Sequence, residues 1–242
     1  MSPDGKNTTK FLSNPSAGMI RANSCPDGHY VMVERSEDGG ANKVNIWRLN
    51  ADGSNPKQLT NGNSDIAARC TRDGKWVYYQ DWFTDLIMRV PMDGGKPEAV
   101  PGAAIPNTIF AQPGMAISPD GKTMTFLVVQ IEKDGPIYKL AFVPLDAGPT
   151  PSVQLVDPDP RVSENPEFTP DGSAVIYPIR EHGVENLWLQ PLDGSRGRQI
   201  THFESDQIQA LHFSPDGKTL GVFRQHIESD VVLLQDTSTV PQ

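Results

Sequence analysis

The sequence predicts an all-β protein, a β-propeller of about five four-stranded blades, and the spacing and chemistry of one turn motif carry that prediction. An Asp-Gly turn recurs along the chain at intervals of 45 to 51 residues, with aspartates at Asp27, Asp73, Asp120, Asp171 and Asp216. A fixed period of this length is typical of propellers and solenoids. Asp can bond its own backbone two residues on, and Gly adopts the positive φ that a tight hairpin needs. Each copy therefore predicts strand, turn, strand.

The second strand of each repeat is predicted from apolar residues four and six positions after the aspartate. These pairs are Val31 and Val33, Val77 and Tyr79, Met124 and Phe126, Val175 and Tyr177, and Leu220 and Val222. Apolar side chains at a period of two place one face of a strand in a core.

A third and a fourth strand complete each unit. The third strands are predicted at 45–49, 85–90, 136–140, 186–189 and 230–234. A second hairpin follows at Asp52-Gly53, Asp93-Gly94 and Asp193-Gly194, with a looser copy at Asp146-Ala147, and short outer strands come next, as at 57–60 and 198–201. Four antiparallel strands joined by hairpins make a propeller blade. Residues 101–113 and 146–162 are rich in Pro and lack a period, so they predict long loops.

The two ends of the sequence predict how the ring closes. Residues 4–13 match the fourth-strand segment 52–60, while the last repeat ends on a third strand. An outer strand at 8–13 would therefore complete the last blade and cover its edge. The predicted single domain, 1–242, then has blades at 14–60, 61–101, 102–156, 157–201, and 202–236 with 8–13. A piece of a six- or seven-bladed ring is the alternative.

The composition narrows the class of partner. The net charge of −9 and pI near 5.0 argue against nucleic acid, which demands a basic face, and against an anionic membrane surface. No apolar run has the length of a membrane span, and residues 1–6 lack the apolar region of a secretory leader. We expect no direct membrane insertion, and the compartment stays open.

The two cysteines are predicted to be buried thiols. Cys25 and Cys70 lie near equivalent points of successive repeats but are offset by one position relative to the turn aspartate. Adjacent positions of a strand point to opposite faces, so the offset favours two small buried side chains over a disulfide.

The repeat resembles a known family. The element (Phe/Ile)-(Ser/Thr)-Pro-Asp-Gly-Lys, an apolar strand, then Asn-Leu-Trp and a later Gln-(Leu/Ile)-Thr is similar to the TolB-like, WD-like propeller repeat, in five copies over essentially the whole chain. The ending 226–234 looks most like the C-terminal sensor propeller of bacterial membrane-anchored Ser/Thr kinases. The resemblance implies a protein- or peptide-binding platform, extracytoplasmic if it belongs to a membrane-anchored protein. Arg72 departs from the pattern, because it replaces the turn proline.

Candidate ligand-binding residues lie ahead of the turns, where the inner strands of a propeller begin at the channel mouth. They are Arg21, Asn23, Asp65, Arg69, Gln112, Glu164, Asn165, Glu167, Asp206, Gln209 and His212. Two arginines facing several carboxylates suit a peptide or a sugar. A solvated lining whose charges satisfy one another is the simpler interpretation, because polar channels are general in this fold.

An enzyme is the alternative from a second class. Asp65, Glu164 and Glu167 are the only trio that could serve a carbohydrate-active hydrolase as acid and base. The sequence has no nucleophile elbow, zinc-binding His-Glu-x-x-His or phosphate-binding loop, and its histidines are scattered. We therefore predict no catalytic residue, no metal and no cofactor, and a binding module as the function.

One aromatic pair has two interpretations. Trp82 and Phe83 follow Asp81 in a predicted turn. Exposed, they would be an anchor for a protein contact. Burial under a neighbouring blade is the interpretation we favour from the sequence.

Overall fold

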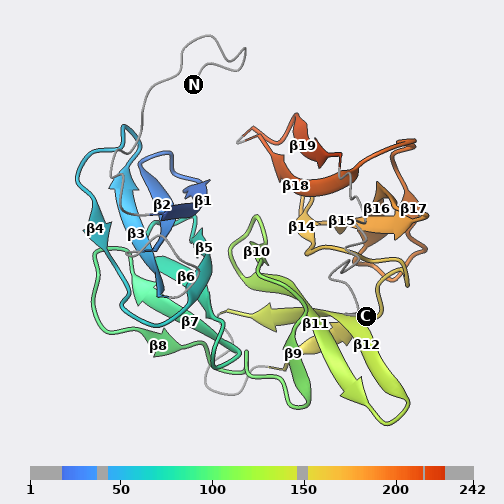
Figure 1. Ribbon diagram of the computed structural model, residues 1–242, viewed down its shortest axis with the longest axis horizontal. Helices are drawn as coiled ribbons and strands as arrows, with labels where there is room; N and C mark the ends of the chain where they lie inside the picture. Colours follow the sequence, from blue (N-terminus) through green and yellow to red (C-terminus); the bar gives the residue numbers. More distant parts are fainter. Residues whose placement is uncertain (1–17, 37–42, 146–151, 215, 227–242) are drawn as a thin grey trace, which may run out of the picture.

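The computed structural model describes residues 18–36, 43–145, 152–214 and 216–226, and within these ranges the protein is a β-propeller (Figure 1). Five antiparallel sheets follow one another around a central axis, as the repeat predicts. No helix occurs in the described ranges, so none that could cross a membrane is found there.

The first two sheets have four strands each, in sequential order. The first contains β1 (Gly18–Ser24), β2 (Tyr30–Ser36), β3 (Val44–Asn50) and β4 (Lys57–Gln58). The second contains β5 (Asp65–Cys70), β6 (Trp76–Asp81), β7 (Leu86–Pro91) and β8 (Glu98–Ala99).

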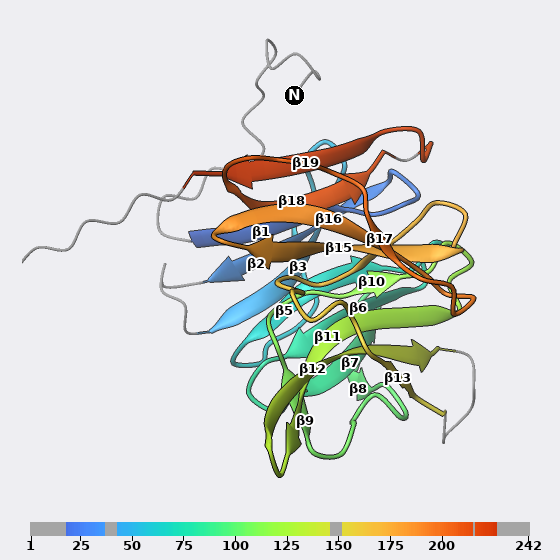
Figure 2. The same cartoon turned by 90° about the vertical axis from the view of Figure 1, so that its right-hand side faces the viewer.

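The other three sheets differ in strand number. The third has five strands: β9 (Thr108–Phe110), β10 (Ala116–Ile117), β11 (Thr123–Glu132), β12 (Gly135–Pro144) and β13 (Gln154–Val156). The fourth has β14 (Glu167–Phe168), β15 (Ala174–Glu181), β16 (Val184–Pro191) and β17 (Arg198–Gln199). The described part of the fifth has β18 (Gln207–Phe213) and β19 (Leu220–Gln225). Figure 2 shows the sheets in side view.

Two segments expected as loops contain short strands. β9 lies within 101–113, where it pairs with the distal half of β11, and β13 lies within 146–162, where it pairs with β12. The prediction of loops was wrong here. β9 is an added strand that pairs with the extended end of the ten-residue strand β11, and β13 is the outer strand of the third blade, paired with residues 140–142 of β12. Such short strands are stabilised by pairing rather than by any pattern of their own. The predicted closing strand at 8–13 and third strand at 230–234 lie outside the described residues.

The Asp-Gly turns have the predicted geometry, and the third repeat shows it in full. Gly121 has φ 73° and its N–H donates to the Ser118 carbonyl at 2.8 Å. Asp120 Oδ1 accepts the Lys122 N–H at 3.0 Å and the Ser118 hydroxyl at 2.5 Å. These bonds lower the pKa of Asp120. The side chain therefore closes the turn from inside, as the motif predicts.

The second strands pack between the sheets. Val77, Met124, Phe126, Val175 and Tyr177 are each fully buried. Their side chains belong to three apolar clusters that join successive sheets from the first to the fourth, and a fourth cluster joins the fourth sheet to the fifth. Leu220 and Val222 of the last pair are only half-buried. The predicted core is thus present, and it is tightest in the middle blades.

Buried polar side chains also join neighbouring blades. Each accepts a hydrogen bond from a backbone N–H of an adjacent sheet or the loop before it: Glu34 from Ala67 at 2.8 Å, Gln80 from Gly114 at 3.0 Å, Asn165 from Leu127 at 2.8 Å and Glu185 from Ile208 at 2.6 Å. Two of the donor N–H groups, those of Ala67 and Ile208, lie at irregularities of β5 and β18, between Ile66 and Arg69 and between Ile208 and Ala210. A bulge frees a backbone group from its own ladder, so a side chain must bond it when it is buried.

The cysteine prediction was wrong, because Cys25 and Cys70 form a disulfide with their Cα atoms 5.3 Å apart. Cys70 ends β5, but Cys25 lies beyond the end of β1, where its carbonyl accepts the Gly28 N–H of the turn. The alternation of side chains along a strand therefore does not apply to Cys25. Both cysteines lie in the apolar cluster between the first and second sheets, so the disulfide crosslinks these two blades.

We expect Gln80→Leu to lower the free energy of unfolding by about 2–4 kcal/mol, because the buried N–H and carbonyl of Gly114 both lose their partner. Urea unfolding followed by circular dichroism measures the change. Gln225→Leu, at an exposed position of β19, is the matched control and should change it by less than about 0.5 kcal/mol. Equal effects of the two substitutions would contradict the role given to Gln80.

Candidate functional site

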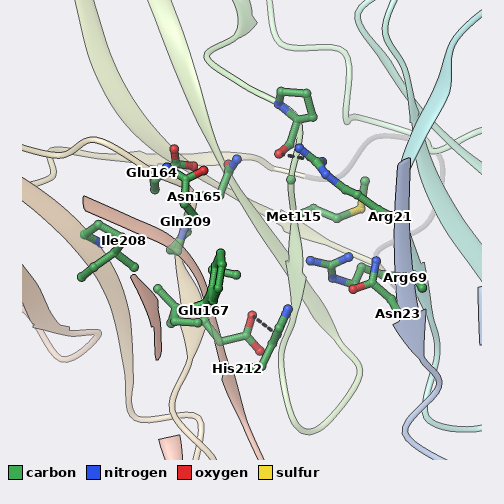
Figure 3. Close-up of a pocket in the computed structure, with 18 residues that line it drawn as sticks. Arg21, Asn23, Arg69, Met115, Glu164, Asn165, Glu167, Ile208, Gln209 and His212 are labelled. Atoms are coloured by element: carbon green, nitrogen blue, oxygen red, sulfur yellow. Dashed lines mark hydrogen bonds and ion pairs between the residues drawn. The ribbon is translucent and has the colours of Figure 1, made fainter. Parts of the chain in front are cut away.

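A cavity of about 460 Å³ opens where the inner strands begin, and eight of the eleven predicted residues line it (Figure 3). We call it the mouth cavity. The eight are Arg21, Asn23, Arg69, Glu164, Asn165, Glu167, Gln209 and His212. They come from β1, β5, β14, β18 and the segment before β14, so the cavity lies on the propeller axis where four blades converge.

The cations enter from the first two blades. Arg21 donates to the Pro113 carbonyl at 3.4 Å, and half-buried Arg69 donates to the Ala68 carbonyl at 3.0 Å. Asn23 lies between them and its amide donates to the same Ala68 carbonyl at 3.5 Å. A guanidinium has five N–H donors, so each arginine keeps donors for a ligand. Burial lowers the pKa of Arg69, which remains a cation at neutral pH.

Glu34 lies behind the two arginines and is a site residue that the sequence did not reveal. Its carboxyl is 1% exposed, and burial raises its pKa, while Arg21 and Arg69 oppose that rise. Oε1 bonds Ala67, and Oε2 has no hydrogen-bond partner. Glu34 and Gln80 each follow their turn aspartate by seven residues. A polar residue at this repeat position, within an otherwise apolar strand, was the sequence signal that could have identified Glu34.

The carboxyl groups enter from the fourth blade, opposite the arginines in Figure 3. Burial raises the pKa of Glu164 to about 7, and the charge of Glu185 adds to the rise. Burial also raises the pKa of Glu167 to about 7, against the opposing effect of Arg69. Glu167 Oε2 lies 3.8 Å from His212 Nδ1, and burial and Arg69 lower the pKa of that histidine.

The charges across the cavity are separated. Among the described residues, no ion pair within 4.0 Å joins Arg21 or Arg69 to Glu164 or Glu167. The simpler expectation, a lining that neutralises itself by direct pairing, is therefore not what these four side chains form. Both signs of charge face one cavity and can interact with a ligand.

Asp65 does not line the mouth cavity. Its carboxylate is 3% exposed, accepts the Gly62 N–H at 2.9 Å and is also hydrogen-bonded by Thr60. Burial raises its pKa. Asp65 therefore organises the loop that leads into β5, and the predicted carboxylate trio is reduced to Glu164 and Glu167.

Gln112 and Asp206 also lie outside the mouth cavity. The Gln112 amide donates to the Ser163 carbonyl at 2.8 Å, which links the third blade to the fourth. Asp206 pairs with Arg224 at 3.2 Å and with His226 at 3.0 Å. Both residues were predicted at the mouth from their distance in sequence to the turn aspartate. That distance does not determine the direction of a loop side chain.

Asn165 lines the cavity but is committed to structure. Its Oδ1 accepts the Leu127 N–H at 2.8 Å, and its amide donates to the Gln112 carbonyl at 3.3 Å. A Cβ at Gly114 would meet the Asn165 amide nitrogen at 2.6 Å, so the two blades fit closely here. The Asn165 side chain therefore joins the fourth blade to the third at the edge of the mouth cavity.

The cavity wall also has an apolar part, which the sequence did not reveal. Pro113, Met115, Pro178, Ile208 and Phe223 contribute it, and Phe223 is 63% exposed. Pro178 and Phe223 occupy the same column as Glu34 and Gln80, seven residues after the turn aspartate. At this repeat position, the apolar residues Pro178 and Phe223 therefore line the mouth cavity, whereas a polar residue bonds the backbone of the next blade.

The aromatic turn is only partly covered. Trp82 stacks on Phe110 of β9, with ring centroids 6.0 Å apart, and is 36% exposed. Phe83 is 69% exposed, so the favoured interpretation of burial is wrong for Phe83. The adjacent blade covers one ring and not its neighbour.

The comparisons with known proteins agree with the geometry of the fold. No family model matches the sequence, and no curated protein matches it. Among solved structures, the chain is similar to a protein described as TolB from Agrobacterium tumefaciens, with TM-score 0.67 and 20% identity over 89% of this chain and 73% of that one. An oligogalacturonate lyase in complex with manganese matches with TM-score 0.67 and 19% identity, over 90% of this chain and 62% of that one.

Further structures share the architecture. TolB from Acinetobacter baumannii matches with TM-score 0.61 and 19% identity over 88% of this chain and 48% of that one. The chain thus spans between about half and three quarters of these relatives. The class of protein is a β-propeller with a mixed-charge axial cavity. Its fold is that of TolB-like propellers, as the repeat implied, and at this level of identity the likeness concerns the fold alone.

We expect the stability of the protein to fall as pH rises from about 4.5 to 7. The folded protein holds the protons of Glu164 and Glu167 up to about pH 7, whereas the unfolded chain releases them near 4.5. The native state binds more protons in this window, so the free energy of unfolding decreases across it. The variant Glu164→Gln/Glu167→Gln should lose this decline and gain about 1–3 kcal/mol relative to wild type between pH 5 and pH 8.

Urea unfolding at pH 5, 6, 7 and 8 measures this difference. Glu204→Gln, at an exposed site, is the control and should track the wild type at each pH. Parallel pH profiles for the wild type and the double variant would contradict the assignment.

Proposed function

We propose that this propeller is a non-catalytic binding module whose mouth cavity takes a segment of a protein or peptide that carries both a cation and an anion. The observation behind the proposal is the separation of opposite charges across one cavity: Arg21 and Arg69 lie on one side, Glu164 and Glu167 lie on the other, and among the described residues no ion pair within 4.0 Å joins the two sides. A ligand that bridges the two sides replaces solvent at both.

The size and wall of the cavity support a peptide segment. A volume of about 460 Å³ lies in the range of ligand sites. Met115, Ile208 and Phe223 offer apolar surface beside the charges. Aliphatic and aromatic side chains of a peptide gain from such contacts, whereas the charged groups set its direction.

The role in the cell follows as a hypothesis. The resemblance of the repeat to sensor propellers suggests that the module serves a larger signalling or envelope protein as its docking part. Among the similar structures, one is titled as a complex of nidogen with laminin, so a propeller of this general shape occurs in a protein–protein complex.

A peptide display experiment tests the proposal. A phage library of random heptapeptides is selected on the wild type and, in parallel, on the variant Arg21→Ala/Glu164→Gln, and the enrichment of each peptide is compared between the two selections. We expect enriched peptides with at least one basic and one acidic residue, and binding at least about tenfold weaker in the double variant, since a tenfold change corresponds to about 1.4 kcal/mol.

Isothermal titration with the enriched peptides gives the affinities, with Arg198→Ala on the exposed outer strand β17 as the control of unchanged affinity. Enriched peptides that bind the double variant as well as the wild type would place recognition elsewhere. A library that yields no enrichment would contradict peptide binding.

A carbohydrate-active enzyme is the second candidate, and one observation favours it. Glu164 and Glu167 line one cavity with pKa values near 7, which suits acid and base catalysis. Oligogalacturonate lyases are among the structures with this fold. Among the described residues, however, no group of three or more His, Cys, Asp or Glu side chains is placed to hold a metal ion, and Asp65 is bound in its loop.

Incubation with oligogalacturonate and with neutral glycans, with and without Mn²⁺, separates the two functions. Under the binding proposal the protein gives no product above a buffer blank. Product formation that is lost in both Glu164→Gln and Glu167→Gln, with folding intact, would establish the enzyme instead.

A further inference from the structure

The axial channel continues beyond the mouth cavity to the opposite face of the propeller. A middle cavity of about 370 Å³ shares Arg69, Glu167 and His212 with the mouth cavity. A third cavity of about 330 Å³ shares Cys70, Arg72 and Glu167 with the middle one and is bordered by the Asp-Gly turns. We call this third space the turn-side chamber.

The wall of the turn-side chamber combines apolar and polar residues. Five blades contribute to it, and its apolar residues are Pro26, Ile117, Pro119, Phe168, Pro170 and Phe213. Phe168 is buried and packs edge-on against Phe142, with ring centroids 6.3 Å apart, so its ring is held in place. Proline and fixed aromatic rings lose little conformational freedom when a ligand packs on them.

Arg72 is the one cation that lines the chamber among the described residues. It stands at the turn position that proline occupies at Pro26, Pro119 and Pro170. The Arg72 side chain is exposed, and its Nη1 donates to the Pro119 carbonyl at 3.2 Å. Within the described part of the chain, no carboxylate lies within 4.0 Å of it. The guanidinium is thus anchored on one side and free on the other.

The acidic groups near the chamber have partners of their own. Asp216 accepts the Ser214 hydroxyl at 2.6 Å and the Lys218 N–H at 3.1 Å, so it closes its own turn. Asp73, next to Arg72, accepts the Thr71 hydroxyl at 2.6 Å and lies 3.3 Å from Lys75 Nζ. Glu167 lies at the inner end of the chamber, and its Oε2 is 3.8 Å from His212 Nδ1. Arg72 therefore remains available to an incoming anion.

We propose that the turn-side chamber binds a short apolar group that carries one carboxylate, with the carboxylate on Arg72 and the apolar body between Phe168, Phe213 and the turn prolines. A guanidinium bonds a carboxylate through two parallel N–H donors, which fixes the orientation of the ligand. The volume of the chamber suits an organic acid of about ten non-hydrogen atoms or the last side chain of a peptide with its free carboxyl terminus. This site is separate from the peptide-binding mouth and does not depend on it.

Titration of the full chain with matched small molecules tests the proposal. The probes are 3-phenylpropanoate and 3-phenylpropan-1-ol, which share the apolar body, and N-acetyl-Leu-Phe with its amide, which present the same chemistry as a chain terminus. Chemical shifts in ¹H–¹⁵N spectra report binding. We expect each acid to bind with a Kd of about 1 mM or tighter and its neutral counterpart about tenfold more weakly.

Two substitutions locate the effect. Arg72→Gln should remove the preference for the acid while leaving weak binding of the apolar body. Lys122→Gln removes an equal charge from a side chain that does not line the chamber, and should leave the preference intact. Thermal unfolding of both variants checks that the fold is kept.

Three results would overturn the proposal. The acid and its neutral counterpart bind equally, or the preference survives in Arg72→Gln, or no saturable shift occurs up to about 10 mM ligand. Shifts that saturate at mouth residues such as Gln209 and spare Phe213 would also overturn it, because the acid would then occupy the other end of the channel.

Discussion

The buried side chain that bonds the backbone of the next blade is the interaction on which the rest of the structure depends. Apolar clusters fill the spaces between the sheets, but apolar contact is non-directional and would tolerate small rotations of one blade against another. Gln80 bonds both the N–H and the carbonyl of Gly114, and it is fully buried. A partner displaced by about 1 Å would weaken both bonds and leave up to four buried polar atoms poorly satisfied, so the angle between the blades is restricted.

The same interaction places the site. The inner strands β5 and β18 have irregular pairing where Glu34 and Glu185 bond them. Arg69 follows the irregularity in β5, Gln209 lies within that of β18, and both residues line the mouth cavity. Glu34 also lies close enough to Arg21 and Arg69 for their charges to lower its pKa. One buried carboxyl group thus both joins two blades and helps to hold two cations at the rim, which connects the stability of the ring to the charge of its mouth.

The channel has two chemically different ends with Glu167 between them. The mouth cavity offers charges of both signs, whereas the turn-side chamber offers apolar side chains and the single cation Arg72. Glu167 lines the mouth, the middle and the turn-side spaces, and its pKa near 7 makes its charge sensitive to conditions near neutrality. The mouth cavity and the turn-side chamber therefore meet at one titratable carboxyl group.

The sequence by itself determined the repeat, the turns, the buried strand faces and most of the residues at the mouth, because period, Asp-Gly chemistry and alternation are local properties of the chain. Tertiary structure decided the rest. It took Asp65, Gln112 and Asp206 out of the mouth cavity, because Asp65 bonds the Gly62 N–H, Gln112 bonds the Ser163 carbonyl and Asp206 pairs with the Arg224 side chain. It paired Cys25 with Cys70 across two blades, and it gave β9 a partner in the extended β11. The Gln112 bond and the disulfide depend on where a neighbouring blade lies, whereas the Asp206 ion pair and the β9–β11 pairing join segments of one blade. The distance between two such segments is not a local property of the sequence.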